Sequence, residues 1–285
     1  MIMEKISLEA PAKINLGLNI LEKREDGYHD IETIYVPLQL KDKVTLEKRK
    51  KGIVINCNNP DIPLNEKNLA YKAAKLMREK ARYYGGVSIT IDKKIPIGGG
   101  LGGGSSDAAS VLRGLNILWN TNFSLKTLKK LGIKIGSDVP FFMINKACIG
   151  RGKGEILQPI PFKYSNIWII IVYPNIKIES KWAYENLNLT KNKKIINFYS
   201  FLKKSRDPSE LRDRIVNDFE TIVFEKFPEI KKIKETLYDF GADFCLMTGS
   251  GSAIYGMFKR REKAVKSAEN FLGKYTTIIT QPRLE

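Results

Sequence analysis

With 285 residues, 43% of them hydrophobic, the chain is long enough to bury one large or two medium-sized cores, and none of its apolar runs approaches a membrane span, so we expect a cytoplasmic protein without a membrane partner. A single histidine excludes a two-histidine zinc site, and three widely separated cysteines exclude a paired zinc or redox motif. The net charge of +17 is spread over lysine pairs, as on a solvated surface, although nucleic-acid binding and steering of a polyphosphate substrate are alternatives.

The first predicted element is a strand over residues 12–20, where apolar and polar residues alternate strictly. Its polar face carries Lys13 and Asn15, which therefore project together, although an ordinary solvent-facing strand would show the same pattern. The turn-rich loop after the strand places an aromatic residue, Tyr28, beside the only histidine, His29. Such a pair could stack on a flat ligand.

The middle of the chain mixes strands and helices without the regular alternation of a doubly wound sheet, which indicates an α+β fold. Residue patterns predict strands over residues 31–46, with breaks near Pro37 and Lys41-Asp42, over 53–55 and over 87–91, and helices over 68–82, 108–119 and 124–132.

The most informative stretch lies between the strand at residues 87–91 and the helix at residues 108–119. It consists of Pro96, Ile97, Gly98, Gly99, Gly100, Leu101, Gly102, Gly103, Gly104, Ser105 and Ser106. Glycine reaches positive φ without a Cβ clash, and its N–H groups, together with the unpaired donors of a helix N-terminus, favour an anion. We therefore predict that this glycine stretch, residues 96–106, holds the phosphates of a nucleoside triphosphate.

Three alternative kinds of loop share some of these features. A flexible linker seldom adjoins a strand and a capped helix so closely. A nucleoside triphosphatase loop needs Lys and then Ser or Thr after its last glycine, whereas Ser105 follows Gly104 directly. The dinucleotide fingerprint is matched by Gly98, Gly100 and Gly103, but no second strand ending in an acid is predicted after the helix, so a nicotinamide enzyme is not expected.

Two further segments carry candidate chemistry. Asp138 precedes an apolar run and could be the N-cap of a short helix with Pro140 in its first turn, a position that also suits a catalytic acid. Lys153 lies in a second glycine-rich, basic loop at residues 150–154, which could contact phosphate or simply turn the chain.

The composition shifts near residue 159, where we place a boundary between an N-terminal domain, residues 1–158, and a C-terminal domain, residues 159–285. In the second domain we predict strands over residues 167–173 and 254–258 and helices over 208–227, 228–240 and 261–272.

A glycine–hydroxyl loop at residues 247–253 precedes the last of these strands, and a second loop of this kind makes phosphate binding more credible. Tyr184 either lines a site or belongs to the start of a helix. The lysine- and asparagine-rich segment at residues 190–206 matches no motif, and we expect it to be partly mobile.

Phosphoryl transfer needs donors that hold the phosphates, cations that neutralise them, and a group that orients or deprotonates the attacking hydroxyl. Here the glycine stretch would hold a triphosphate whose oxygens a Mg²⁺ ion bridges, and Asp138 would accept the proton of an acceptor alcohol. A nearby lysine would keep that carboxylate ionised, and Lys13 fits this role.

The glycine stretch resembles the glycine–serine signature of the GHMP kinases, a superfamily of small-molecule kinases. The closer resemblance is to the branch of the superfamily that acts in non-mevalonate isoprenoid precursor synthesis. The other passages that carry it are Pro11-Ala-Lys13-Ile-Asn15-Leu, Asp26-Gly-Tyr28-His29, Gly136-Ser-Asp138-Val-Pro140 and Thr248-Gly-Ser-Gly251. Together they run from residue 11 to about residue 258, which is nearly the whole chain.

This resemblance implies a two-domain α+β fold with the active site in the cleft between the domains. It implies that ATP, with Mg²⁺, phosphorylates the 2-hydroxyl of 4-diphosphocytidyl-2-C-methyl-D-erythritol, a small cytidine diphosphate substrate, to give the 2-phosphate and ADP. A kinase of homoserine or mevalonate type is an alternative, against which the loop that carries Tyr28 argues. A nucleic-acid-binding protein is another alternative, which rests on net charge alone, so no nucleic-acid partner is expected.

The resemblance also implies residue roles. Asp138 takes the position of the catalytic base, and Lys13 takes that of its partner. Asn15 is an implied substrate contact. Tyr28 and His29 would hold the cytosine, with Tyr184 as a second stacking face and Lys153 as a weaker contact. One departure is Asp107, because asparagine is as frequent after the two serines of this motif.

Overall fold

The computed structural model of the protein describes residues 3–187 and 197–284 and divides into two compact units. The first unit comprises Met1–Ala12, Leu40–Ile95 and Gly102–Asn145, and the second unit comprises Lys13–Gln39, Pro96–Leu101 and Lys146–Glu285. Two long strands, β1 (Lys5–Lys23) and β2 (His29–Arg49), supply residues to both units. The predicted boundary between residues 158 and 159 divides the chain into two contiguous domains, whereas each unit is built from several segments, so that boundary stays a prediction.

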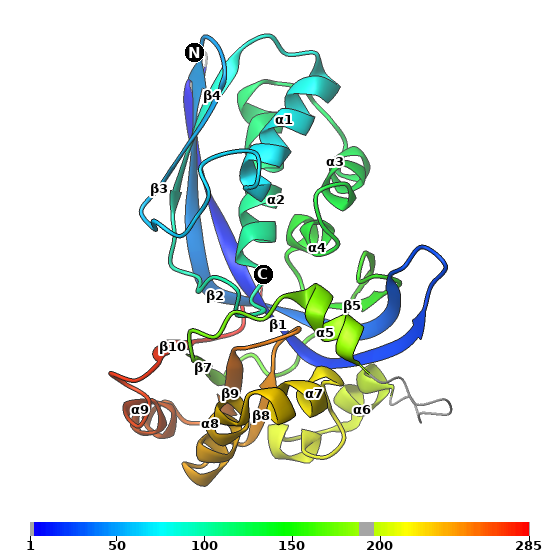
Figure 1. Cartoon of the computed structure of the whole chain (residues 1–285), viewed down its shortest axis with the longest axis vertical. Coiled ribbons are helices and arrows are strands. Elements are labelled where there is room, and N and C mark those ends of the chain that lie inside the picture. The colour runs from blue at the N-terminus through cyan, green and yellow to red at the C-terminus, as the bar shows by residue number, and fades with distance from the viewer. Residues whose placement is uncertain (1–2, 188–196, 285) are drawn as a thin grey trace. The chain divides into compact units, whose positions relative to one another are not determined.

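The first unit is a sheet covered on one face by helices (Figure 1). The C-terminal half of β2 pairs with β4 (Gly86–Asp92) in antiparallel fashion, and β4 pairs with β3 (Ile53–Cys57) in parallel. The helices are α1 (Leu69–Ala81), α2 (Gly103–Leu118), α3 (Leu125–Ile133) and α4 (Val139–Ile144). A close approach of α2 to the sheet requires Gly114, because a Cβ there would lie 2.5 Å from Leu46 Cδ1.

The helix starts of this unit follow from local capping chemistry. The side chain of Asn68 accepts a hydrogen bond from the Ala70 N–H at 2.8 Å, and that of Ser124 accepts one from the Thr127 N–H at 3.2 Å. Each bond satisfies one of the unpaired N–H groups of a first helical turn. These caps agree with the predicted starts of the two helices.

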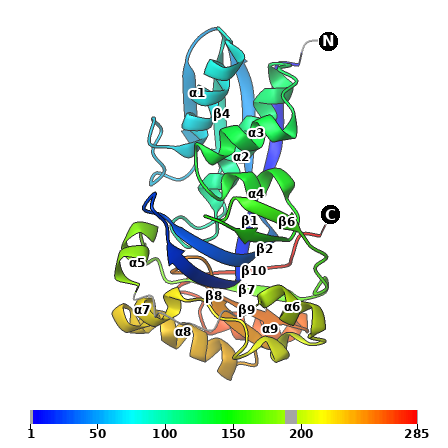
Figure 2. The same ribbon diagram turned by 90° about the vertical axis from the view of Figure 1, so that its right-hand side faces the viewer.

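The second unit contains a four-stranded antiparallel sheet with helices packed on it. The strand order is β10 (Thr276–Thr280), β7 (Trp168–Tyr173), β9 (Ile254–Phe258) and β8 (Phe244–Met247). Helices α7 (Phe219–Lys226), α8 (Pro228–Asp239) and α9 (Arg261–Glu269) lie along it (Figure 2). Their apolar residues form one buried core with Ile170, Val172 and Ile254 of the sheet.

The remaining elements of the second unit are shorter. They are β5 (Cys148–Arg151), which pairs with residues 33–35 of β2, β6 (Ile156–Pro159), α5 (Ser180–Asn186), α6 (Phe198–Lys204) and the 3-10 helix η1 (Pro208–Leu211). The lysine-rich segment predicted to be partly mobile lies partly outside the described residues, and its described end forms α6. Strands β5, β6, β8 and β10 are not among the elements predicted from the sequence.

Two predicted elements are wrong in their continuity. Strand β2 runs unbroken through Pro37 and Asp42. The helix predicted over residues 208–227 is instead η1 and α7, separated by residues 212–218, which contain a turn and one bridging residue, Asn217. That segment pairs with β1, since the Leu18 N–H donates to Val216 O at 2.8 Å and the Asp218 N–H donates to Leu18 O at 3.0 Å.

No helix in the described part of the chain is both long enough and apolar enough to cross a lipid bilayer.

Candidate active site

Lys13 and Asn15 lie side by side on β1, as the alternation predicts, but they are buried in the second unit. Only 3% of Lys13 and 2% of Asn15 are exposed, so this strand face is not an ordinary solvent face. Lys13 Nζ donates to Asn15 Oδ1 at 2.6 Å, and Asn15 Nδ2 donates to Thr33 Oγ1 of β2 at 2.9 Å. Burying polar side chains costs free energy unless hydrogen bonds compensate for the lost contacts with water, and these bonds supply that compensation.

The second glycine–hydroxyl loop meets this pair inside the same unit. The Asn15 N–H donates to Thr248 Oγ1 at 3.1 Å, and the Thr248 hydroxyl lies within donating distance of Asn15 Oδ1, at 3.4 Å, and of Gly100 O, at 3.3 Å. Thr248 is fully buried. One hydroxyl therefore joins the strand that carries Lys13 to the glycine stretch.

The N-terminal part of the glycine stretch is held by backbone bonds within the second unit. The Lys13 N–H donates to Leu101 O at 3.0 Å, and the Ala253 N–H donates to Gly99 O at 3.3 Å. A Cβ at Gly100 would lie 2.1 Å from Thr248 O, so any residue with a side chain would clash at this position. The two glycine loops predicted from the sequence thus pack backbone against backbone.

Positive φ angles recur along the glycine stretch. Gly98, Gly100 and Gly102 have φ of 75°, 76° and 71°, values that residues with a Cβ rarely adopt. Gly102 is the N-cap of α2. Successive residues of alternating handedness turn their N–H groups toward a common concave side, which is how backbone binds phosphate. This geometry supports the predicted anion site.

A buried charge cluster lies beneath the start of α2 in the first unit. Lys93 Nζ donates to Asp42 Oδ2 at 2.5 Å and to Asp107 Oδ2 at 2.8 Å, and at most 5% of any of the three side chains is exposed. Asp42 Oδ1 also accepts the N–H groups of residues 94 and 95. A Cβ at Gly103 would lie 2.8 Å from Lys93 Nζ, so the ammonium sits directly against the helix start.

This cluster is not predicted from the sequence, because its members are far apart in the chain. One signal was present: Asp42 shares its strand face with Val44 and Leu46, both of which are buried. An acid on the buried face of a strand indicates a buried partner.

Burial raises the pKa of Asp107 to about 7, with attraction to Lys93 opposing the rise and repulsion from Asp42 adding to it. Two carboxylates share one ammonium, and Asp107 Oδ1 is buried without a protein hydrogen-bond partner. The ionised form of this carboxyl is therefore disfavoured in the folded protein.

Replacing Asp107 by Asn should make the protein increasingly stable relative to the parent as the pH rises from about 4 to about 7. Over this range the carboxyl is ionised in the unfolded chain, since its ordinary pKa is 3.8, but protonated in the folded one. The parent thus loses up to about 1.4 kcal/mol of unfolding free energy per pH unit from this group. Thermal melts at several pH values measure the difference, with the exposed Asp61→Asn as control. The same pH dependence in both variants would contradict the assignment.

Asp138 occupies the N-cap position of α4, as predicted, with Pro140 in the first turn. Its side chain makes no capping bond to that helix. A Cβ at Gly136 would lie 3.9 Å from Ser105 Oγ, so the loop before Asp138 lies beside the C-terminal end of the glycine stretch within the first unit. Lys13 belongs to the second unit, and its pairing with Asp138 stays a prediction.

The aromatic residues predicted to hold a base lie in the second unit. The rings of His29 and Tyr184 are stacked, with centroids 4.9 Å apart and planes 13° from parallel. Phe219 packs edge-on against Tyr184. No third ring fits between two rings at this spacing. Burial, and secondarily the charge of Lys23, lowers the pKa of His29, so its imidazole is neutral at pH 7.

Tyr28 lies beside Lys153, another predicted contact. Lys153 Nζ is 3.9 Å from the centroid of the Tyr28 ring and 2.9 Å from Asp26 Oδ2. The hydrogen bond from Lys153 lowers the pKa of Asp26 to about 2. Tyr28 is nevertheless 58% exposed, which leaves ring surface for a ligand.

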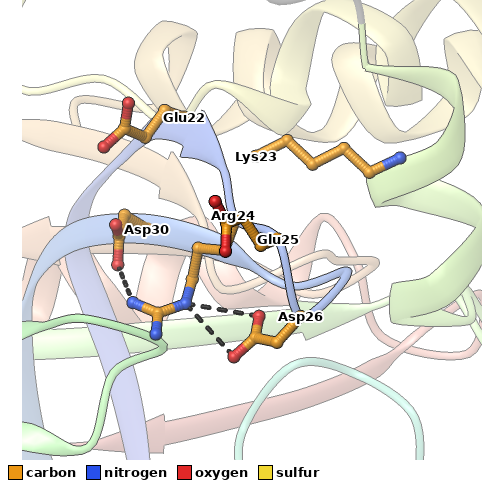
Figure 3. Close-up of a pocket in the computed structure, with 6 residues that line it drawn as sticks. All are labelled: Glu22, Lys23, Arg24, Glu25, Asp26 and Asp30. Atoms are coloured by element: carbon orange, nitrogen blue, oxygen red, sulfur yellow. Dashed lines mark hydrogen bonds and ion pairs between the residues drawn. The ribbon is translucent and has the colours of Figure 1, made fainter.

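The same loop borders a pocket of about 490 Å³ (Figure 3). Its lining consists of Glu22, Lys23, Arg24, Glu25, Asp26 and Asp30. Arg24 is occupied by Asp30, at 2.7 Å, and by Asp26, at 3.3 Å. Because carboxylates outnumber the cations, this lining does not suit a phosphate, and it better suits hydroxyl or amino groups.

Family models match two segments of the chain. Residues 68–146 match the GHMP kinases N terminal domain, and residues 198–275 match the GHMP kinases C terminal model. The two segments contain α2 with Ser105 and Asp138 in the first case, and Thr248 in the second.

Individual relatives match over nearly the whole length. The 4-diphosphocytidyl-2-C-methyl-D-erythritol kinase of Macrococcus caseolyticus (strain JCSC5402) is 42% identical over 266 residues, which cover 92% of this chain and 93% of that protein. A crystal structure of 4-(cytidine 5'-diphospho)-2C-methyl-D-erythritol kinase superposes with a TM-score of 0.82 at 32% identity, covering 97% of this chain and 99% of that one. The mevalonate kinase of Methanococcus jannaschii shares the fold, with a TM-score of 0.76 at 16% identity, 98% of each chain being covered.

Proposed function

Because the chain belongs to the GHMP kinases, in the family of the 4-diphosphocytidyl-2-C-methyl-D-erythritol kinases, we propose that it transfers the γ-phosphoryl group of ATP to the 2-hydroxyl of 4-diphosphocytidyl-2-C-methyl-D-erythritol. The products are the 2-phosphate and ADP, and the reaction belongs to non-mevalonate isoprenoid precursor synthesis in the cytoplasm. The observation that carries the proposal is the junction at Thr248, where the strand of Lys13 and Asn15 meets the glycine stretch.

In this proposal the glycine stretch holds the ATP phosphates. The backbone N–H groups around Gly98, Gly100 and Gly102, together with the N-terminus of α2, supply donors to the phosphate oxygens. Donors fixed before the substrate binds need no reorganisation when charge shifts onto the β-phosphate oxygens during transfer.

We propose that the Mg²⁺ ion enters the site bound to the phosphates of ATP. Across the described residues, no group of three or more His, Cys, Asp or Glu side chains could hold a metal ion. Mg²⁺ keeps several waters and is commonly bound through substrate phosphates rather than by an all-protein cage. Bound in that way, it would neutralise the triphosphate and align its terminal group.

We assign the acceptor chemistry to Asp138, with Lys13 as its partner. The Asp138 carboxylate accepts the proton of the 2-hydroxyl, the oxygen bonds to the γ-phosphorus, and the bond to the bridging oxygen of ADP breaks. Asn15, held between Lys13 and Thr33, contacts the alcohol. A double-mutant cycle with Lys13→Met and Asp138→Asn should show strong non-additivity if the two act as one unit.

The cytosine is assigned to the loop of Tyr28 and His29. The neutral imidazole of His29 has one donor and one acceptor nitrogen, which suits the amide-like edge of a pyrimidine. Tyr28 offers the exposed ring for stacking, and Lys153 beside it would exchange its ion pair with Asp26 for a diphosphate oxygen.

Tyr28→Ala should therefore raise the KM for the cytidine diphosphate substrate by about fivefold to a hundredfold, since base–aromatic stacking contributes about 1–3 kcal/mol. The KM for ATP should stay within about twofold of the parent value, because the nucleotide phosphates are held elsewhere. Steady-state kinetics with each substrate varied in turn measure both constants. Tyr84→Ala, at an exposed tyrosine of the first unit, is the matched control. Equal changes in both KM values would argue against a cytosine site here.

The direct test of the proposed function is a coupled ADP assay with purified protein and a panel of alcohols. The expected result is ADP release with 4-diphosphocytidyl-2-C-methyl-D-erythritol, and background rates with homoserine and mevalonate. Turnover of homoserine or mevalonate in preference to the cytidine compound would replace the proposal by the alternative kinases of the superfamily. A nucleic-acid-binding function would instead show salt-sensitive binding of DNA or RNA that survives Asp138→Asn.

A further inference from the structure

A short segment at residues 216–218 interrupts the helix predicted there and lies along β1, with Asn217 bridging to Leu18. Its backbone bonds to Leu18 form a short parallel pairing. The carboxylate of Asp218 adds a third link, because its Oδ2 accepts the Ile20 N–H at 2.6 Å. The segment is thus attached to the strand that carries Lys13 and Asn15, a few residues further along.

The middle residue of this segment, Asn217, reaches across to the loop that follows β8. Its Nδ2 donates to Met247 O at 2.8 Å and to Gly249 O at 2.8 Å, and its Oδ1 accepts the Phe219 N–H at 3.1 Å. Only 3% of Asn217 is exposed. A primary amide has two N–H donors and one carbonyl acceptor, and here every one of them is engaged.

The two carbonyls that Asn217 binds flank Thr248. On the other side of Met247, Glu220 Oε1 accepts the Met247 N–H at 2.9 Å, while its Oε2 is paired with Lys234 Nζ at 2.6 Å. Side chains from residues 217–220 therefore hold both backbone groups of Met247. These bonds add to those of Thr248 itself, whose N–H donates to Ala253 O at 3.0 Å and whose carbonyl accepts the Gly251 N–H at 3.1 Å.

Thr248 is the residue whose hydroxyl contacts both Asn15 and Gly100. A shift of Thr248 by a fraction of an ångström would move the alcohol contact and the phosphate loop relative to each other. Rates of group transfer are sensitive to displacements of this size.

We propose that Asn217 is a positioning residue for phosphoryl transfer, which rests on the proposed function. Its amide fixes the carbonyls on either side of Thr248, and Thr248 in turn holds Asn15 and Gly100 in register. Asn217 itself touches neither substrate in this assignment. Its effect is on the fraction of bound substrate pairs that are aligned to react, so it acts on kcat more than on folding.

The chain offers a matched control in the first unit. Asn116 also makes three hydrogen bonds with its side chain, to Phe123 O at 3.1 Å, from the Phe123 N–H at 2.8 Å and from Thr121 Oγ1 at 2.7 Å. Asn116→Ala and Asn217→Ala each remove three bonds that hold a loop. A merely structural role for Asn217 predicts that both variants lose stability and keep kcat per folded molecule.

Positioning predicts a different outcome, measured well below the melting temperature of each variant. Asn217→Ala should lower kcat by about ten- to a hundredfold, and Asn116→Ala should leave it within about twofold of the parent. Asn217→Asp places a carboxylate oxygen where the amide donated to the carbonyls of Met247 and Gly249. A protonated carboxyl can donate a hydrogen bond, whereas a carboxylate cannot. The kcat of this variant relative to the parent should therefore rise as the pH falls. Equal kcat for parent and Asn217→Ala, or a flat pH ratio, would overturn the proposal.

A second readout needs no substrate. Backbone hydrogen exchange of Asn15 and Ala253, whose N–H groups bond to Thr248 Oγ1 and Gly99 O, should accelerate by about tenfold or more in Asn217→Ala and stay unchanged in Asn116→Ala. Unchanged exchange in both variants would reject the positioning role. If the parent failed to phosphorylate the cytidine substrate, the proposed function would fall while exchange still decided the role of Asn217.

Discussion

Replacing Asp138 by asparagine should lower kcat by about a thousandfold while ATP binding stays close to that of the parent. The amide keeps the size and the polar contacts of the carboxylate but cannot accept the proton that leaves the 2-hydroxyl. The proposed phosphate donors lie in the glycine stretch, which the change does not alter. ADP release under saturating substrates and calorimetric titration with ATP measure the two quantities separately.

Two controls sharpen this test. Asp61→Asn removes an exposed carboxylate of the same unit and should leave kcat unchanged. Lys13→Met in the Asp138→Asn background should add little further loss, because a partner matters only while the base is present. Near-normal turnover of Asp138→Asn would show that the hydroxyl proton leaves by another route and that Asp138 only orients the alcohol.

Strand periodicity correctly placed Lys13 and Asn15 on one face of β1, but it could not separate a solvent face from a buried site. The difference is made by partners far away in the chain, above all Thr248, which is 233 positions from Asn15. Alternation of polar and apolar residues indicates which residues share a face of the strand, but it does not indicate which other segments cover that face. The second glycine loop was noted in the sequence only as support for phosphate binding, and its contact with this strand required the structure.

The glycine stretch was predictable because its requirement is local. Positive φ at Gly98, Gly100 and Gly102 is a property of single residues, which glycine meets and other residues do not. The charge cluster of Asp42, Lys93 and Asp107 depends instead on tertiary packing, as does the bonding of Asn217. No pattern within a sequence window encodes such contacts, so they required the structure.

The wrong predictions have the same origin. Pro37 was expected to break β2, yet it falls between residues 33–35, which pair with β5, and residues 43–49, which pair with β4. The strand continues past the proline because the Pro37 carbonyl still accepts the Arg283 N–H at 2.8 Å and Leu38 forms a bridge with Pro282, a pairing with the C-terminal segment that no local pattern indicates. The helix predicted over residues 208–227 lost its middle to pairing with β1, a tertiary contact that outweighed helical propensity.

The close packing of the two glycine loops makes Gly100 the most sensitive position of the glycine stretch. Two effects act on any larger residue there. A Cβ would lie 2.1 Å from Thr248 O, so one backbone must move, and φ of 76° is strained for a residue with a side chain. The backbone term alone amounts to about 1–2 kcal/mol. Separating the clash from this term requires a glycine of the same φ in open space.

Gly273 meets this requirement, since its φ is also 76° and a Cβ there would meet no atom within 4 Å. Gly273→Ala should lower the unfolding free energy by about 1–2 kcal/mol and leave kcat/KM unchanged. Gly100→Ala should cost more stability than this control and lower kcat/KM by at least about a hundredfold, because Thr248 and the proposed phosphate donors would be displaced together. Thermal unfolding, steady-state kinetics and ATP titration of the two variants supply the comparison. If both alanine variants behaved alike, the contact between the two glycine loops would have no part in phosphate binding.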